Sequence, residues 1–342
     1  MIKEEQLKTN KKIKALALLS GGLDSVLAIK LILKQGIDVV ALNFTSSFGR
    51  YDSTNQDCSP VVKAIASQLG VELKAVYLGQ DYLDMIKNPK YGYGKNVNPC
   101  IDCRIFKFKK AKKIMQDQQA NFIITGEVLG QRPMSQHRKA LEAIEKESNL
   151  EGLILRPLSA KLFSETIAEA KGWVDREKLF DISGRTRRPQ MNLAQYFGIK
   201  NYLYPSGGCL LTESAFSKRV KDAIKHNEFT IETIEFFKTG RYFRINTSFK
   251  LFVGRDEKEN DRLVSMAKNG DFIFETTLLP GPAAVGKGYA DKSVKKICCS
   301  IIAWYTSKEK EVEVKVRDTS KEDEETFSVR AIDSQELENL RI

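Results

Sequence analysis

The sequence has no long hydrophobic run. In 342 residues, no stretch approaches the ~20 consecutive apolar residues that cross a bilayer. The first residues, MIKEEQLKTNKKIKALALLSGG, are charged, and they lack the long apolar core and small-residue cleavage site of a signal peptide. We therefore expect a cytoplasmic protein without a membrane partner.

Cysteine is scarce, and internal repeats and low-complexity segments are absent. Because the expected compartment is reducing, the six cysteines argue against a disulfide framework. Two of them, Cys100 and Cys103, form a CxxC pair, which in such a protein indicates metal binding or redox activity first.

Acidic residues are outnumbered by basic ones. The chain has 55 Lys and Arg against 44 Asp and Glu, for a net charge of +11 and a pI near 9.2. An excess of positive charge raises the local concentration of polyanions, and nucleic acid is the natural candidate. The charge favours this partner without specifying it.

The first half of the chain predicts a doubly wound α/β domain. Short apolar runs alternate there with helical patterns, which is typical of βαβ units around a parallel sheet covered on both faces. Right-handed crossovers make such a sheet doubly wound. The expected strands lie at 14–20, 37–44, 71–79 and 121–127, and the expected helices at 24–35, 61–70 and 105–118.

From about residue 240 the pattern changes to that of a smaller α+β domain. RYFRI, FKLFVG, DFIFETTL and the alternating EVEVKVR are typical of strands, and SVKKICCSIIAWYT is typical of a helix. We expect residues 226–239 to form a linker helix and the charged stretch 317–326 to be a solvated turn. The predicted domains are therefore 1–225 and 240–342.

A glycine-rich turn joins the first expected strand to the first expected helix. Its sequence is SGGLDS, and it is not a Walker loop because the GxxxxGK[ST] pattern is absent. Glycines let main-chain N–H groups approach an anion, and the helix N-terminus adds a positive dipole end. Asp24 and Ser25 can cap the first turn. A well-capped junction without a ligand is the alternative.

Three cysteines lie in segments rich in glycine, asparagine or proline. Cys100 and Cys103 form NPCIDC in an expected loop before a lysine-rich helix, and Cys209 ends the turn PSGGC. Two thiolates do not complete a zinc or iron–sulfur site, so we expect Cys209 to be a third ligand. Incidental thiols are the alternative.

The remaining cysteines have other surroundings. Cys298 and Cys299 lie in an apolar helical segment and are expected in the core, as free cysteine often is. Cys58 follows the second expected strand, on the same sheet edge as the glycine-rich turn, and its role stays open.

The full SGGLDS turn resembles the pyrophosphatase loop of PP-loop enzymes, which form an adenylate from ATP and release pyrophosphate. The resemblance implies an adenine nucleotide α-hydrolase-like fold that uses ATP with Mg²⁺. It implies that ATP binds to Ser20, Gly21, Gly22, Asp24, Ser25, Asn43, Phe44 and Gly126.

Further motifs resemble the tRNA 4-thiouridine and 2-thiouridine synthase families. TGEVLGQ, the following SQ and a later RPL carry this resemblance over roughly residues 12–225, and NPCxxC and GGC stand where these families place sulfur-handling cysteines. The resemblance implies catalytic roles for Asp24, Cys100, Cys103 and Cys209.

Two departures from these families bear on the mechanism. Familiar 4-thiouridine synthases carry an N-terminal tRNA-binding module, whereas here the phosphate loop begins at residue 20. Many 2-thiouridine synthases have an aspartate where Cys100 stands. A third thiolate in its place favours the cluster-dependent branch, in which three cysteines hold a [4Fe-4S] cluster, here Cys100, Cys103 and Cys209.

The C-terminal part resembles the RNA-binding domain of the NFACT ribosome quality-control proteins. VGRD, the nearby END, DFIFETTLLPGP and the SVKKICC helix carry the resemblance, over roughly residues 240–335. It implies a tRNA-binding module, and a dimerisation appendage in a homodimer is the alternative. The expected phosphate contacts are Arg241, Arg244, Lys250 and Arg255.

Together these resemblances imply an ATP-dependent tRNA thiolase. It adenylates a uridine oxygen, releases pyrophosphate and AMP, and inserts sulfur from inorganic sulfide or a cysteine desulfurase. Three alternatives stay open: persulfide chemistry on Cys209 or Cys103 without a cluster, an RNA-binding quality-control factor with a nucleotide-sensing domain, and an adenylating ligase or amidase acting on a small molecule.

Overall fold

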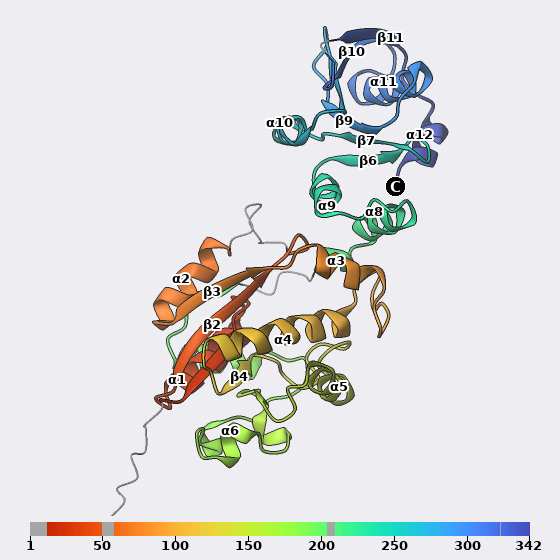
Figure 1. Ribbon diagram of the computed structural model, residues 1–342. Helices are drawn as coiled ribbons and strands as arrows, with labels where there is room; N and C mark the ends of the chain where they lie inside the picture. The colour runs from red at the N-terminus through yellow and green to blue at the C-terminus, as the bar shows by residue number, and fades with distance from the viewer. Residues whose placement is uncertain (1–11, 50–57, 204–208, 322) are drawn as a thin grey trace, which may run out of the picture. The chain divides into compact units, whose positions relative to one another are not determined.

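The computed structural model describes residues 12–49, 58–203, 209–321 and 323–342. The chain divides into two compact units at Thr212 and Glu213, and each unit has its own sheet and core (Figure 1).

The sheet of the first unit is parallel, and its strand order is β3-β2-β1-β4-β5. The chain leaves β1 toward one edge and returns to its other side at β4, so the order reverses there. Ligands of such sheets bind at the carboxyl ends of the strands where the order reverses. The predicted doubly wound α/β fold is confirmed. The strands are β1 (Lys14–Leu18), β2 (Asp38–Thr45), β3 (Glu72–Tyr77), β4 (Phe122–Thr125) and β5 (Ile154–Leu155).

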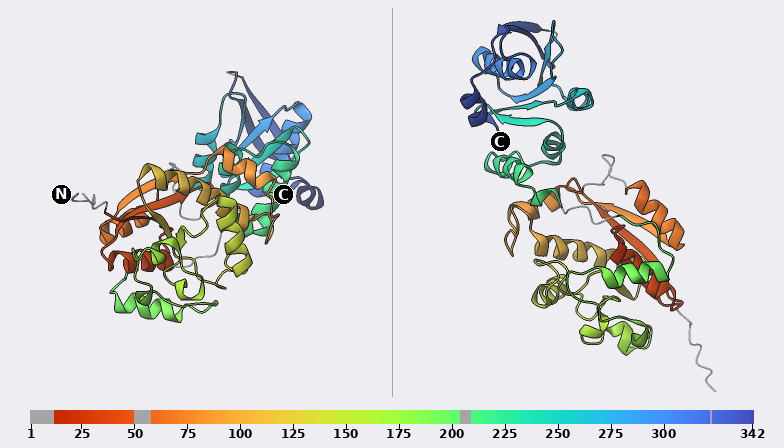
Figure 2. Two further views of the ribbon diagram at one scale, coloured as in Figure 1. Left: turned by 60° about the horizontal axis from the view of Figure 1, so that its bottom comes forward. Right: turned by 180° about the vertical axis from the view of Figure 1, so that it is seen from behind.

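Helices cover both faces of this sheet. Seen from behind, α1 lies in front of the strands with α7 beside it, and α4 covers the opposite face (Figure 2). The helices are α1 (Leu23–Leu33), α2 (Pro60–Leu69), α3 (Gln80–Lys87), α4 (Cys100–Asp117), α5 (Arg138–Ser148), α6 (Ile167–Ala170) and α7 (Arg188–Tyr196). Short 3₁₀ turns span Ala160–Leu162, Arg176–Lys178 and Leu210–Thr212.

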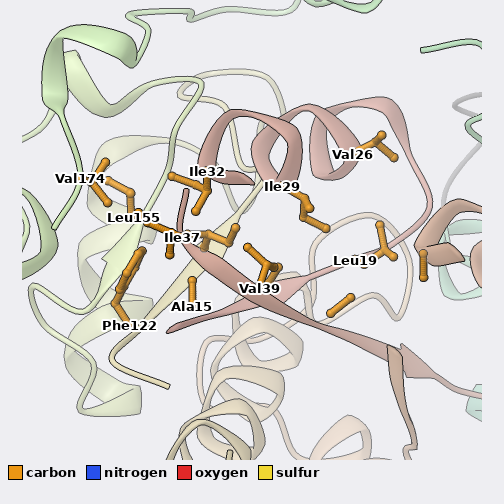
Figure 3. Close-up of a cluster of buried hydrophobic side chains, with 14 of the residues drawn as sticks. Ala15, Leu19, Val26, Ile29, Ile32, Ile37, Val39, Phe122, Leu155 and Val174 are labelled. Carbon is orange, nitrogen blue, oxygen red and sulfur yellow. The ribbon is translucent and has the colours of Figure 1, made fainter. Parts of the chain in front are cut away.

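Helix α1 is buried on two sides, which explains why it is almost wholly apolar. Val26, Ile29 and Ile32 pack on the sheet beside Val39 and Phe122 (Figure 3). On its other side, a second cluster joins the helix to α7 and the segment before it. That cluster contains Leu23, Leu27, Leu31, Val128, Leu158, Ile182 and Ala194. This packing holds the start of α1 against the sheet edge.

The second unit is an antiparallel sheet with the order β11-β10-β8-β9-β7-β6. Helix α11 packs on one face, where Cys298 and Cys299 are fully buried among apolar side chains (Figure 1). The predicted α+β domain is confirmed. Its elements are β6 (Arg241–Arg244), β7 (Phe249–Val253), α10 (Glu257–Met266), β8 (Phe272–Thr276), β9 (Ala284–Gly288), α11 (Lys292–Thr306), β10 (Val312–Asp318), β11 (Glu324–Val329) and α12 (Ser334–Leu340).

Two expectations about the second unit are corrected. Residues 226–239 do not form a linker, because α8 (Ser214–Lys225) and α9 (Ile231–Lys238) pack within this unit. Phe236 of α9, for example, lies 4.7 Å from Phe252 of β7, ring centre to ring centre. The turn is shorter than the expected range 317–326, because Arg317 of β10 already pairs with Glu324 of β11.

The helices of both units are short or carry many charges. The 18-residue helix α4, for instance, has the sequence CIDCRIFKFKKAKKIMQD. Among the described residues, no helix is both long and apolar enough to cross a membrane.

Candidate functional site

A cavity of about 510 Å³ opens at the carboxyl edge of the first sheet. Its walls are the turn after β1, the ends of β2 and β4, the start of α4 and the turn at Cys209. The structure thus brings together residues that are up to about half the chain apart in sequence. Of the predicted site residues, the cavity is lined by Ser20, Gly22, Asp24, Ser25, Asn43, Phe44, Cys100, Cys103, Gly126 and Cys209.

The SGGLDS turn is held by its own hydroxyls. Ser25 Oγ donates to the carbonyl of Gly22 (2.8 Å) and accepts from the main-chain N–H of Ser20 (3.3 Å). Gly22 is the N-cap of α1, and no side chain caps this helix, so the expected capping by Asp24 or Ser25 is wrong. The N–H of Ser25 donates to the Gly22 carbonyl (3.1 Å), so the N–H groups of Leu23 and Asp24 are the ones available to an anion, as in helix-terminal phosphate sites.

Gly21 has a backbone conformation that other residues rarely adopt, with φ of +80°. Its carbonyl accepts from the N–H of Leu203 (2.7 Å), and a Cβ at Gly21 would lie 2.8 Å from the Leu203 side chain. The segment at Leu203 thus covers the turn and fixes its shape.

Gly126, just after β4, lies directly against the main chain of the SGGLDS turn. A Cβ built there would lie 2.4 Å from the carbonyl carbon of Asp24 and 2.4 Å from the nitrogen of Ser25. Only glycine fits, because the obstacles are main-chain atoms that cannot move away. The TGE segment thereby positions the SGGLDS turn.

We expect Gly126→Ala to displace this turn and weaken ATP binding at least tenfold, because overpacking at such a contact costs about 1–3 kcal/mol. Titration calorimetry with ATP measures the change. Gly79→Ala is the matched control, since Gly79 precedes α3 with φ of −88° and its Cβ would meet nothing closer than 4.0 Å. Equal affinity in both variants would show that the turn does not bind the nucleotide.

Asp24 lies on the first turn of α1, at the cavity wall. Its Oδ2 accepts from Gln131 Nε2 (2.7 Å), and Gln131 in turn accepts from Gln190 Nε2 (2.9 Å). Its Oδ1 is buried and has no hydrogen-bond partner among the described residues. A buried carboxylate oxygen without a partner fits Mg²⁺, which binds few carboxylates together with substrate phosphates.

The two residues at the end of β2 differ in what they offer a ligand. Asn43 is buried, and its Nδ2 donates to the carbonyl of Leu19 (2.8 Å), so its amide joins the ends of β1 and β2. Phe44 is half-buried and lines the cavity with Leu18. Phe44 therefore offers an apolar face, while the Asn43 side chain is mainly structural.

The three predicted sulfur-handling cysteines meet in this cavity. Cys100 and Cys103 lie on the first turn of α4, which begins five residues earlier than expected, and Cys209 lines the same cavity just before the 3₁₀ turn Leu210–Thr212. Tyr82 Oη and Cys103 Sγ lie 3.0 Å apart. Burial raises the pKa of the Cys209 thiol to about 12 and raises that of Cys100. Residues 205–208, which precede Cys209, lie outside the described part of the chain.

Hydrogen bonds tie the two cysteine-bearing segments together. Asn96 Nδ2 donates to the carbonyl of Thr212 (2.8 Å), and the N–H of Val97 donates to the carbonyl of Leu211 (3.3 Å). Thr212 Oγ1 closes the turn by donating to the carbonyl of Cys209 (2.7 Å). The spacing of the thiols is therefore built into the fold.

Three thiols around one cavity fit an iron–sulfur group by donor chemistry, since soft thiolates select such metals. No three His, Cys, Asp or Glu side chains in the described ranges converge closely enough to hold a single metal ion. Cys58 is 2% exposed in the core beneath α2 and does not line the cavity. Cys298 and Cys299 are core residues, as predicted.

Four basic side chains of the cavity were not predicted. Arg104 and Lys107 extend the face of α4 that carries the cysteines, while Arg132 and Arg187 come from loops. Buried Glu127 holds Arg104 in place with an ion pair of 2.9 Å. Arg132 lies within electrostatic reach of Asp24, Arg104 and Arg187. These charges fit an anionic substrate.

The predicted phosphate contacts in the second unit are partly wrong. Arg244 Nη2 lies 2.7 Å from Asp222 and 2.6 Å from Glu228, and Lys250 Nζ lies 2.9 Å from Glu228. Both basic side chains are at most 9% exposed. They hold α8 and the α8–α9 loop to the sheet and present no charge to a phosphate.

The other two predicted contacts are more accessible. Arg241 is half-buried, donates to the carbonyl of Gly254 and lies 4.2 Å from the ring centre of Tyr305. Arg255 is exposed and paired with Glu259. These two remain proposed RNA contacts.

We expect Arg244→Ala to destabilise the second unit by about 3–5 kcal/mol, because it removes a largely buried cation that pairs with both Asp222 and Glu228. Arg255→Ala should cost less than about 1 kcal/mol, because its ion pair is exposed. Both variants are made in a Trp173→Phe background, in which Trp304 of the second unit is the one remaining tryptophan. Urea unfolding followed by Trp304 fluorescence then measures the stability of the second unit in each variant. Wild-type stability with weaker RNA binding in Arg244→Ala would instead make Arg244 an RNA contact.

The parallel sheet with a cavity at its carboxyl edge and the following α+β domain are each similar to a known family. Residues 11–175 match the family described as thiamine biosynthesis protein (ThiI), and residues 240–341 match the NFACT protein RNA binding domain. The predicted resemblance to PP-loop tRNA thiouridine synthases with an NFACT-type domain is confirmed.

Curated relatives agree with this match. The tRNA-specific 2-thiouridylase of Marinomonas sp. is 25% identical over 234 residues, covering 66% of this chain and 56% of the relative. That of Tolumonas auensis is 26% identical, covering 66% of this chain and 60% of the relative. The chain thus spans little more than half the length of these relatives.

A solved structure is similar to this chain at a lower sequence identity. The U34-tRNA thiolase NcsA from Methanococcus maripaludis, solved with its [4Fe-4S] cluster, is 17% identical with a TM-score of 0.34. The match covers 66% of this chain and 72% of that one.

Proposed function

We propose that this protein is an ATP-dependent tRNA sulfurtransferase, which adenylates a uridine oxygen and replaces it with sulfur. The observation that carries the proposal is a shared cavity of about 510 Å³, lined by both the phosphate loop and three cysteines. A small-molecule ligase would need the first feature and not the second. The match to 2-thiouridylases and to an RNA-binding domain supports tRNA as the substrate.

The chemistry begins with activation, because a uracil oxygen is a poor leaving group. That oxygen attacks the α-phosphate of ATP, pyrophosphate leaves, and the base becomes adenylated. The N–H groups at the start of α1 and the guanidinium groups of Arg104, Arg132 and Arg187 stabilise the charge that develops on the phosphates. Asp24, with its unpartnered Oδ1, is the proposed Mg²⁺ ligand.

Sulfur then attacks the activated carbon, and the oxygen leaves with AMP. We propose that Cys100, Cys103 and Cys209 would hold a [4Fe-4S] cluster, which when bound would supply the sulfur for this step. The proposed sulfur donor is inorganic sulfide or a cysteine desulfurase. Tyr82 is positioned to donate its hydroxyl proton to the Cys103 sulfur and so to orient it.

AMP formation tests the ATP and tRNA parts of the proposal. AMP and pyrophosphate should form in equal amounts, and their rate should rise strongly when tRNA is added. Nucleotide turnover that ignores tRNA would instead point to a small-molecule ligase or amidase.

The visible spectrum and metal content of anaerobically purified protein test the sulfur site. About four irons per chain with broad absorbance near 400 nm are expected of a [4Fe-4S] protein. Zinc in place of iron would make the site structural. Thiolation by metal-free protein that depends on Cys209 would establish the persulfide route.

A further inference from the structure

Two tyrosines shortly before the cysteine segment have hydrogen-bonded hydroxyl groups and partly exposed side chains. Tyr91 and Tyr93 are 39% and 40% exposed. Tyr93 Oη donates to the carbonyls of Ile86 (2.7 Å) and Lys87 (3.1 Å), and Tyr91 Oη donates to Glu147 Oε1 (3.2 Å). Each ring is therefore held in position by hydrogen bonds at its hydroxyl end.

The main chain of this loop is equally well fixed. The N–H groups of Lys90 and Tyr91 donate to the two carboxylate oxygens of Asp102, at 2.9 and 3.0 Å. Asp102 is 7% exposed and lies between Cys100 and Cys103 on α4. The aromatic pair and the cysteine pair are therefore positioned by the same carboxylate.

The loop also reaches the cavity. The N–H of Gly94 donates to the carbonyl of Asn98 (2.9 Å), and Asn98 lines the cavity next to Cys100. A Cβ at Gly94 would lie 2.9 Å from the side chain of Met134, which is 41% exposed and follows the cavity residue Arg132 by two positions. Lys95 adds positive charge to the exposed surface, and Lys90, which is paired with Glu147, lies beside the ring of Tyr91.

We propose that Tyr91 and Tyr93 form a preordered platform on which unpaired RNA bases next to the reacting nucleotide stack. Aromatic rings beside basic side chains are the usual surface for single-stranded RNA, since every base has a face to stack. Holding the rings in advance lowers the entropic cost of binding. This inference rests on the proposed function, and it gives the catalytic domain its own contact with the RNA.

The test compares Tyr91→Ala/Tyr93→Ala with wild type in the full chain. A 12-nucleotide oligouridine and a 12-base-pair RNA duplex serve as probes in fluorescence anisotropy. The double variant should bind the single strand at least about tenfold more weakly, because each stacked base contributes roughly 1–3 kcal/mol. Duplex binding should not change. Tyr196→Ala, which removes a tyrosine that is 76% exposed on α7, should bind both probes as wild type does.

Three further measurements serve as controls. Tyr91→Phe/Tyr93→Phe keeps the rings and should retain most of the single-strand affinity. Ultraviolet crosslinking to oligouridine should label the peptide that contains residues 91–95, and wild-type ATP affinity of the alanine variant shows that the cavity is intact.

Unchanged oligouridine binding, equal loss for strand and duplex, or crosslinks confined to residues 213–342 would each overturn the platform. These outcomes are separate from failure of the proposed function. A wild-type protein that binds oligouridine through the tyrosines but never thiolates tRNA would refute the function and keep the platform.

Discussion

Asp24→Ala should lose at least 100-fold in the rate of pyrophosphate release while keeping the fold of the first domain. Losing one group that stabilises developing negative charge commonly costs two to three orders of magnitude, and Asp24 is proposed to hold the Mg²⁺ that does so here. Asp24 is at the cavity wall, its Oδ1 has no hydrogen-bond partner among the described residues, and its Oδ2 accepts from Gln131. The stability cost should be small, because α1 is held by apolar packing on both sides.

Asp81→Ala is the matched control for this variant. Asp81 is also in the first turn of a helix, α3, but its carboxylate pairs with Lys110 outside the cavity. It should release pyrophosphate at the wild-type rate. A folded Asp24→Ala protein that matched Asp81→Ala would refute the assignment of the phosphate loop.

Cys100→Ala, Cys103→Ala and Cys209→Ala should each abolish tRNA thiolation and lose bound iron together. The three thiols line one cavity from two segments that hydrogen bonds hold together, so each variant leaves the proposed cluster one ligand short. Iron content and thiolated nucleosides are measured on the same preparations. Adenylation without thiolation is the expected residual activity, because the phosphate loop is untouched.

Cys58→Ala, Cys298→Ala and Cys299→Ala are the controls. These cysteines are buried in the two hydrophobic cores and should keep iron and activity, with a packing cost of about 1 kcal/mol. A Cys58→Ala variant that lost its metal would indicate a fourth ligand and a closed structural site. Retention of full activity in any of the three cavity variants would remove that cysteine from the mechanism.

The sequence was sufficient for the parts of the site that are local. SGGLDS and the CxxC pair are short motifs whose chemistry depends on neighbours in sequence, and the strand pattern places the first at the sheet edge. The position of the CxxC pair on a helical face was missed, because α4 was expected to begin at residue 105. With its start at Cys100, the spacing of three and four residues places Cys103, Arg104 and Lys107 on one face.

Long-range partners could not be predicted from one sequence. Arg132 and Arg187 reach the cavity from loops whose positions depend on the packing of α1 and α7. The alternation of apolar and polar residues in β6 and β7 does not reveal that Arg244 and Lys250 form ion pairs with carboxylates of an earlier segment. These carboxylates belong to Asp222 and Glu228. A basic side chain on a strand looks the same in sequence whether it faces RNA or a buried carboxylate.

The most direct test of the account is the fate of sulfur in a complete reaction. Unmodified tRNA is incubated anaerobically with the protein, ATP, Mg²⁺ and ³⁴S-labelled sulfide, and its nucleosides are analysed by mass spectrometry. We expect a ³⁴S-containing thiouridine, formed with one AMP per sulfur and absent without ATP or with Asp24→Ala. Tight tRNA binding with neither AMP nor thiouridine would contradict it and favour an RNA-binding factor that only senses the nucleotide.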